Sequence, residues 1–116
     1  MTQESLPKNI VIRHRDDFEQ LFQSGKRVPG TFVYLLYLPM LSDEPQRPNV
    51  GFVCGKKIGN AVTRNKYKRL MREIFRKHKG LFTGFQVLIV AQSAILNADS
   101  RSLQEEILSL TKALSK

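Results

Sequence analysis

The segment from residue 56 to residue 79 constrains the fold most, because its pattern is helical and only one of its sides can be buried. It holds ten of the nineteen Lys and Arg residues and a single acid, Glu73. We count angles around the helix axis from Val62 at 0°, with about 100° per residue. The apolar side then lies between roughly 80° and 180°, and its members are Tyr67, Leu70, Met71, Ile74 and His78. The polar side gathers between roughly 240° and 340°, with Asn65, Lys68, Arg69, Arg72, Arg76 and Lys79. We therefore expect a helix that packs one stripe on a core and exposes a cationic face.

The same segment accounts for the charge of the whole chain. Ten bases and one acid give +9, which is the formal net charge of the protein. Like charges three and four residues apart repel each other, so a merely solvated helix normally mixes acids among its bases. The four arginines of the segment can each pair with phosphate oxygens at two points. This segregation favours a nucleic acid as partner over a lysine-rich face without a function.

Composition limits the class of protein. A chain of 116 residues with 41% hydrophobic residues fits one folded domain, which we expect to span residues 1–116 with a flexible arm at 1–9. The single Cys54 excludes an intramolecular disulfide and suits the cytoplasm. No apolar run is long enough to span a bilayer, and the first eight residues lack the apolar core of a signal peptide. A nucleic acid is thus preferred to a membrane surface as the anionic partner.

The hydrophobic pattern predicts three helices and three strands in the order α-β-β-α-β-α, an α/β two-layer sandwich. In chain order these are a helix at 16–24, strands at 31–38 and 49–55, the cationic helix from Asn60 to a stop at Gly80, a strand at 85–91 and a last helix from Ser102. The second strand is expected to run antiparallel to the first. The third is almost entirely apolar, as in a central strand. Ser102 and Glu105 have capping-box spacing, and the stripe of the last helix consists of Leu103, Ile107, Leu110 and Leu114.

Aromatic residues distinguish between kinds of nucleic acid. No helix-turn-helix pair or zipper frames the cationic helix, which argues against DNA. Phe18 and Phe22 are four residues apart on the first helix, and Tyr34 and Tyr37 lie in the first strand. Such rings can stack unpaired bases, although a Phe pair at this spacing is more often part of a core. Alternation along the strand puts Tyr34 and Tyr37 on opposite faces, so at most one of them serves a given cleft.

Nothing in the sequence forms a catalytic or metal-binding constellation. His14 lies in a basic arm, and His78 lies on the apolar side of the cationic helix. Cys54 lies inside a predicted buried strand, where a thiol behaves as a small hydrophobe. We therefore predict no catalytic residue, no metal ligand and no cofactor bound by the protein.

The stretch Gly55-Lys56-Lys57-Ile58-Gly59-Asn60-Ala61-Val62-Thr63-Arg64-Asn65-Lys66-Tyr67-Lys68-Arg69, with Arg72-Glu73, resembles the signature of the bacterial ribonuclease P protein subunit. The likeness extends over nearly the whole chain and includes the Asp-Phe-x-x-x-Phe helix before Gly25. The family usually has Arg-Asn-Arg where this chain has Lys at position 66, so charge is kept there and two-pronged phosphate pairing is lost.

The resemblance implies a mixed sheet with a left-handed βαβ crossover, an exception to the usual right-handed rule. It implies a ribonucleoprotein endonuclease in which a catalytic RNA with Mg2+ removes the 5′ leader from precursor tRNA. RNA contacts are then expected from Lys56, Lys57, Arg64, Asn65, Lys66, Lys68, Arg69, Arg72 and Arg76. Phe18, Phe22 and either Tyr34 or a strand neighbour would line a cleft for the leader. The alternative is a non-catalytic protein that binds another structured RNA, such as a ribosomal or assembly factor.

Overall fold

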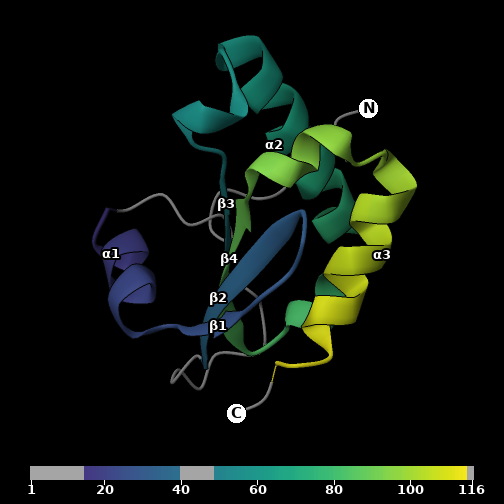
Figure 1. Ribbon diagram of the computed structural model, residues 1–116. Helices are drawn as coiled ribbons and strands as arrows, with labels where there is room; N and C mark the ends of the chain where they lie inside the picture. The colour runs from purple at the N-terminus through teal and green to yellow at the C-terminus, as the bar shows by residue number, and fades with distance from the viewer. Residues whose placement is uncertain (1–14, 40–48, 115–116) are drawn as a thin grey trace, which may run out of the picture.

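The structure is a computed structural model that describes residues 15–39 and 49–114. The expected arm at 1–9 and His14 lie outside these ranges. Figure 1 shows the arrangement of the elements. The helices are α1 (Arg15–Ser24), α2 (Ala61–Lys77) and α3 (Ser100–Thr111), and the strands are β1 (Lys26–Val28), β2 (Val33–Pro39), β3 (Asn49–Val53) and β4 (Phe85–Ala91). The short 3-10 segments are η3 (Lys56–Ile58), η4 (Lys79–Phe82) and η5 (Ser93–Asn97).

The described strands form one mixed sheet in the order β1-β2-β4-β3. β4 is the central strand, antiparallel to β2 and parallel to β3, in agreement with its apolar sequence. β3 runs opposite to β2, as expected, but the two strands do not pair because β4 lies between them. The β3–α2–β4 unit is the parallel crossover that the resemblance implies, and its left-handedness remains a prediction.

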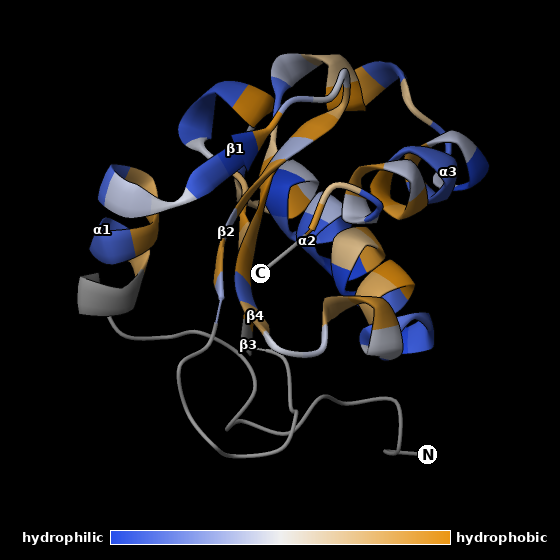
Figure 2. Cartoon of the chain, turned by 90° about the horizontal axis from the view of Figure 1, so that it is seen from below, coloured by the Kyte–Doolittle hydropathy of each residue, from blue (hydrophilic) through white to orange (hydrophobic). Residues whose placement is uncertain are grey.

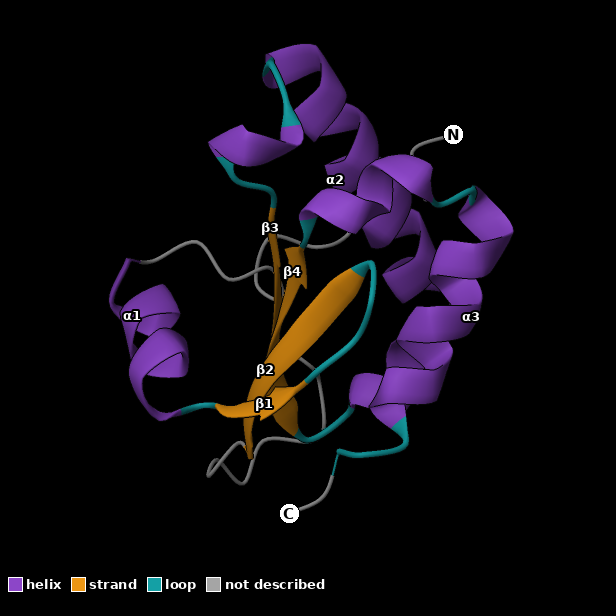
Figure 3. Ribbon diagram, viewed as in Figure 1, coloured by secondary structure: helices purple, strands orange, loops and turns teal. Residues whose placement is uncertain are grey.

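Helices cover both faces of the sheet (Figure 3). Alternate residues of β2, namely Val33, Leu35 and Tyr37, belong to the large core beneath α2 and α3. The intervening Tyr34 and Leu36 pack in a smaller cluster with Leu21 of α1. The mixed α/β class is confirmed, with α1 adding a partial third layer. We call the side of the sheet that α1 covers the α1 face.

β1 is a strand that the sequence pattern did not reveal, because it is three residues long and two of them are charged. It pairs antiparallel with β2, with Arg27 opposite Leu36. Figure 2 shows β1 as hydrophilic beside a largely hydrophobic β2. Backbone pairing with β2 therefore holds β1 at the sheet edge, and its Val28 is the one side chain that reaches the large core.

The start of α3 corrects the predicted capping box. The helix begins at Ser100, and its N-cap is Asp99, whose Oδ1 accepts a hydrogen bond of 2.8 Å from the Ser102 backbone N–H. Glu105 instead forms an exposed ion pair with Arg101 at 3.4 Å. The predicted stripe is confirmed, since Leu103 and Ile107 are buried and Leu110 and Leu114 pack against the same core.

Glu106 attaches α3 to the turn between β1 and β2. Its Oε1 accepts the Thr31 N–H at 3.0 Å, and its Oε2 accepts those of Phe32 at 2.8 Å and Val33 at 2.9 Å. A Cβ on the adjacent Gly30 would lie 2.7 Å from Glu106 Oε2 and 2.3 Å from the Val33 carbonyl oxygen. Only glycine fits this turn while the carboxylate stays in place.

Candidate nucleic-acid interface

The turn before α2 is built to expose two lysines. Ile58 of η3 is buried in the large core, whereas Lys56 and Lys57 are exposed. Gly59 follows at φ +149°, a conformation that favours glycine. Asn60 then caps α2, its Oδ1 accepting the Thr63 N–H at 2.9 Å. This N-cap confirms the predicted helix start, while the helix ends at Lys77, three residues before the predicted stop at Gly80.

Charge is placed against the helix dipole at this end of α2. The first turn contains no acid, and Lys56 and Lys57 precede the N-cap Asn60 in the short η3 segment. The partial positive charge of a helix N-terminus disfavours nearby cations and favours anions. The arrangement is therefore electrostatically unfavourable in the free protein, and an anion bound at this end of α2 would offset it.

Three cations at i, i+4 and i+8 form the side of α2 that adjoins β3. Arg72 Cζ lies 5.5 Å from the centroid of the Phe52 ring in β3. Arg64 and Lys68 lie near the Cys54 thiol, just beyond the end of β3. Arg64 and Lys68 are only half-exposed, and Arg64 Nε is buried without a hydrogen-bond partner among the described residues. Packing thus fixes the stems of these side chains along the sheet edge.

Cys54 is a buried thiol just beyond the end of β3. Burial raises the pKa of its thiol above the ordinary value, although the charges of Lys68 and Arg64 act in the opposite direction. A raised pKa leaves little thiolate, the reactive form. The prediction of a small hydrophobic role agrees with its place in the large core.

The outer side of α2 carries the exposed side chains of Asn65 and Arg69, next to Arg72, which is also exposed. Glu73 partly neutralises this side, since its Oε1 lies 3.9 Å from Nη2 of Arg76. We define the cationic face as the nine predicted RNA-contact residues on η3 and α2: Lys56, Lys57, Arg64, Asn65, Lys66, Lys68, Arg69, Arg72 and Arg76. All nine belong to η3 and α2, with Arg64, Lys68 and Arg72 beside β3 and Lys66 on the flank toward α3.

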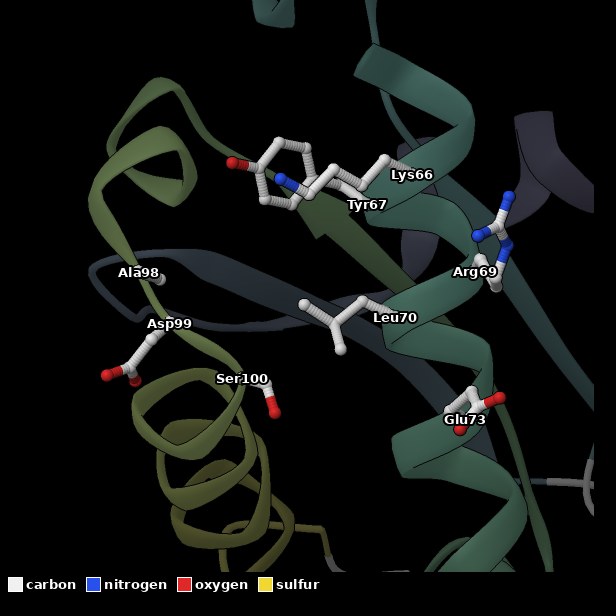
Figure 4. Close-up of a pocket in the computed structure, with 8 residues that line it drawn as sticks. All are labelled: Lys66, Tyr67, Arg69, Leu70, Glu73, Ala98, Asp99 and Ser100. Atoms are coloured by element: carbon white, nitrogen blue, oxygen red, sulfur yellow. The ribbon is translucent and has the colours of Figure 1, made fainter. Parts of the chain in front are cut away.

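Lys66 lies on the other flank of α2, away from β3, beside a pocket of about 330 Å3 between α2 and the start of α3. In Figure 4, Leu70 points into this pocket from α2, Lys66 reaches across the Tyr67 ring, and the Arg69 side chain points away. The Lys66 Nζ is 5.4 Å from the centroid of that ring. Asp99 and Ser100 line the opposite wall. Lys66, which stands where the second Arg of Arg-Asn-Arg is usual, therefore lies apart from the row of Arg64, Lys68 and Arg72.

The predicted aromatic residues gather on the α1 face. Phe18 and Tyr34 pack, partly buried, against the smaller core, and Phe22 is 48% exposed. Tyr37 points to the opposite face, where its ring meets Phe85 edge-on. Of the three strand positions 33–35, only Tyr34 points to the α1 face, since Val33 and Leu35 belong to the large core. Phe18, Phe22 and Tyr34 therefore share one side of the sheet.

β3 connects this aromatic group with the cationic face. A Cβ on Gly51 of β3 would lie 3.2 Å from Phe18 Cε1 and 2.5 Å from Leu88 Cδ2, so α1 approaches β3 closely there. On the other side of the same strand, Phe52 contacts α2 through Arg72. A nucleic acid that follows the β3 edge would meet both surfaces.

Sequence reasoning missed Arg27, because β1 was not predicted. Its Cζ lies over the Tyr34 ring at 3.9 Å from the centroid.

His78 is half-buried at the C-cap of α2. Among residues 15–39 and 49–114, no three His, Cys, Asp or Glu side chains come together as a metal site, and no helix there is long and apolar enough to cross a membrane.

A mixed α/β domain with a segregated cationic helix beside a group of aromatic residues has the features of a nucleic-acid-binding domain. The model of the family described as Ribonuclease P matches residues 6–115, and the chain belongs to that family. The ribonuclease P protein component of Caldanaerobacter subterraneus is 34% identical over 106 residues, which cover 90% of this chain and 89% of the relative. That of Thermotoga maritima is 30% identical over 116 residues, which cover 96% and 97%.

Solved structures agree with the sequence comparison. The RNase P protein from Thermotoga maritima matches with a TM-score of 0.79 and 29% identity, covering 90% of this chain and 97% of that one. The protein from Staphylococcus aureus matches with a TM-score of 0.79 and 25% identity, covering 89% and 93%. The chain is thus a protein subunit of the ribonucleoprotein endoribonuclease RNase P, with its RNA as partner, and the alternative of a ribosomal or assembly factor is not supported.

Proposed function

We propose that the cationic face binds the catalytic RNA of RNase P and that the α1 face receives the single-stranded 5′ leader of precursor tRNA. The separation of charge on α2 carries this proposal. Arg64, Lys68 and Arg72 extend along β3, and the same strand lies beneath Phe18. The cationic face and the α1 face can therefore form one continuous RNA-binding surface across β3.

The division of labour follows from the chemistry of the two surfaces. The cationic face supplies phosphate contacts, which position an RNA without reading its sequence. The partly exposed rings of the α1 face suit unstacked bases, which aromatic side chains bind with little sequence preference. Leader hydrolysis would then be the work of the RNA with Mg2+ ions held by RNA and substrate, in the cytoplasm.

Two substitutions test the assignment of the cationic face. Arg69→Ala removes one exposed cation, and Arg72→Ala removes one exposed cation together with its contact to the Phe52 ring. Each is expected to weaken binding to RNase P RNA and to reduce the slope of log K against log salt by about 0.9 per lost phosphate contact. Binding is measured by filter retention over a series of salt concentrations.

Lys112→Ala is the matched control, because Lys112 is an equally exposed cation at the end of α3. It should leave the slope close to that of the unmodified protein. If Arg69→Ala and Arg72→Ala gave the same slope as Lys112→Ala, the cationic face would not be the contact with this RNA.

A further inference from the structure

Arg27 occupies the one position of β1 that points to the α1 face. β1 and β2 pair with Arg27 opposite Leu36, so Arg27 lies diagonally across from Tyr34 on the same side of the sheet. Its guanidinium carbon is 3.9 Å from the centroid of the Tyr34 ring. Arg27 is exposed and Tyr34 is partly buried. A guanidinium therefore covers the aromatic ring on its outer side.

This arrangement changes what an RNA base meets on the α1 face. A base that approaches Tyr34 from solvent first encounters the flat guanidinium of Arg27. Bases stack on arginine planes as well as on aromatic rings, and the N–H groups at the guanidinium edge remain available to phosphate oxygens. The pair thus offers a stacking plane and a phosphate contact at the same point.

The local charges favour such a role. The cations of α2 lie on the other side of β3. Arg27 brings positive charge directly to the aromatic group.

We propose that Arg27, held over Tyr34, is a contact for single-stranded RNA on the α1 face, where one base stacks on the guanidinium and an adjacent phosphate pairs with its N–H groups. This inference rests on the proposed function and adds to it a residue outside the cationic face and outside the aromatic group.

Lys26 provides the matched control. It precedes Arg27 in the same strand, is also exposed and carries the same charge. Its strand partner is Tyr37, whose ring lies in the large core, so Lys26 belongs to the opposite side of the sheet. Lys26→Ala removes a charge from β1 without removing the contact with Tyr34.

The test uses the full chain and a labelled single-stranded RNA oligonucleotide of leader length, without RNase P RNA. Binding is followed by fluorescence anisotropy at several salt concentrations. Arg27→Ala should weaken binding roughly tenfold and lower the salt slope by about 0.7. Arg27→Lys should keep the slope but lose part of the affinity, because an ammonium provides charge without a stacking plane. Lys26→Ala should stay within about twofold of the unmodified protein.

Either of two results would overturn the inference: equal effects of Arg27→Ala and Lys26→Ala, or an affinity of Arg27→Lys equal to that of the unmodified protein. Unchanged urea unfolding midpoints would show that the variants are folded. The proposed function is tested separately, by comparing the affinity of the unmodified holoenzyme for precursor tRNA with a leader and for leaderless tRNA. If the holoenzyme prefers the tRNA with a leader but Arg27→Ala binds the oligonucleotide as Lys26→Ala does, this inference is rejected and the proposed function stands.

Discussion

At the scale of single residues, Glu106 shows how one side chain can hold two distant segments together. Its carboxylate accepts three backbone N–H groups of the turn between β1 and β2. Two of these donors, the N–H groups of Phe32 and Val33, are part-buried and would otherwise need other partners, because unpaired buried N–H groups are costly. The contact also fixes the turn that orients β1, and therefore Arg27, toward the α1 face.

Glu106→Gln is expected to destabilise the fold by about 1–3 kcal/mol, because an uncharged amide retains one acceptor oxygen for three donors. The free energy of unfolding can be measured by urea denaturation. Glu105→Gln is the control, since its ion pair with Arg101 is exposed and contributes less than about 1 kcal/mol. Equal destabilisation by the two substitutions would contradict the role assigned to Glu106.

At the scale of elements, helix positions could be predicted better than helix ends. The apolar stripe of α2 was correctly placed for Tyr67, Met71 and Ile74, because the helical period depends only on local sequence. The start of α3 was misplaced, since Asp99 and Ser102 both belong to residue types that cap helices and only the folded backbone distinguishes them. β1 was missed for a related reason, as its strand conformation comes from pairing with β2.

The cap of α3 should make the start of this helix sensitive to acid. The backbone N–H of Ser102 donates to Asp99, which lowers the pKa of that carboxyl below its ordinary 3.8. A carboxyl whose pKa is lowered on folding contributes stability above its unfolded pKa and loses it as pH falls through the folded value. We therefore expect the contribution of Asp99 to be complete above about pH 5 and to fade below its ordinary pKa.

Asp99→Asn tests this expectation, because asparagine caps helices without titrating. Unfolding midpoints of both proteins are compared between neutral and acidic pH. The unmodified protein should lose more stability on acidification than Asp99→Asn does. Parallel loss in the two proteins would show that the cap does not carry this pH dependence.

At the scale of the whole molecule, the charge is concentrated on one segment while the remainder is balanced. The sequence alone predicted this segregation and the mixed α/β class, because both follow from composition and period. The strand order did not follow, since the pairing of β4 between β2 and β3 depends on contacts far apart in the chain. The joining of the cationic face to the α1 face along β3 could likewise only be seen in the folded molecule.

The most direct test of the central claim is reconstitution with a bacterial RNase P RNA at low magnesium, with removal of the 5′ leader from precursor tRNA as the readout. Bound to the RNA, the cationic face should reduce phosphate repulsion and lower the magnesium requirement. We predict that adding the chain stimulates leader removal well above the rate of the RNA alone. An unchanged rate, with the RNA shown to be active at high magnesium, would contradict the account.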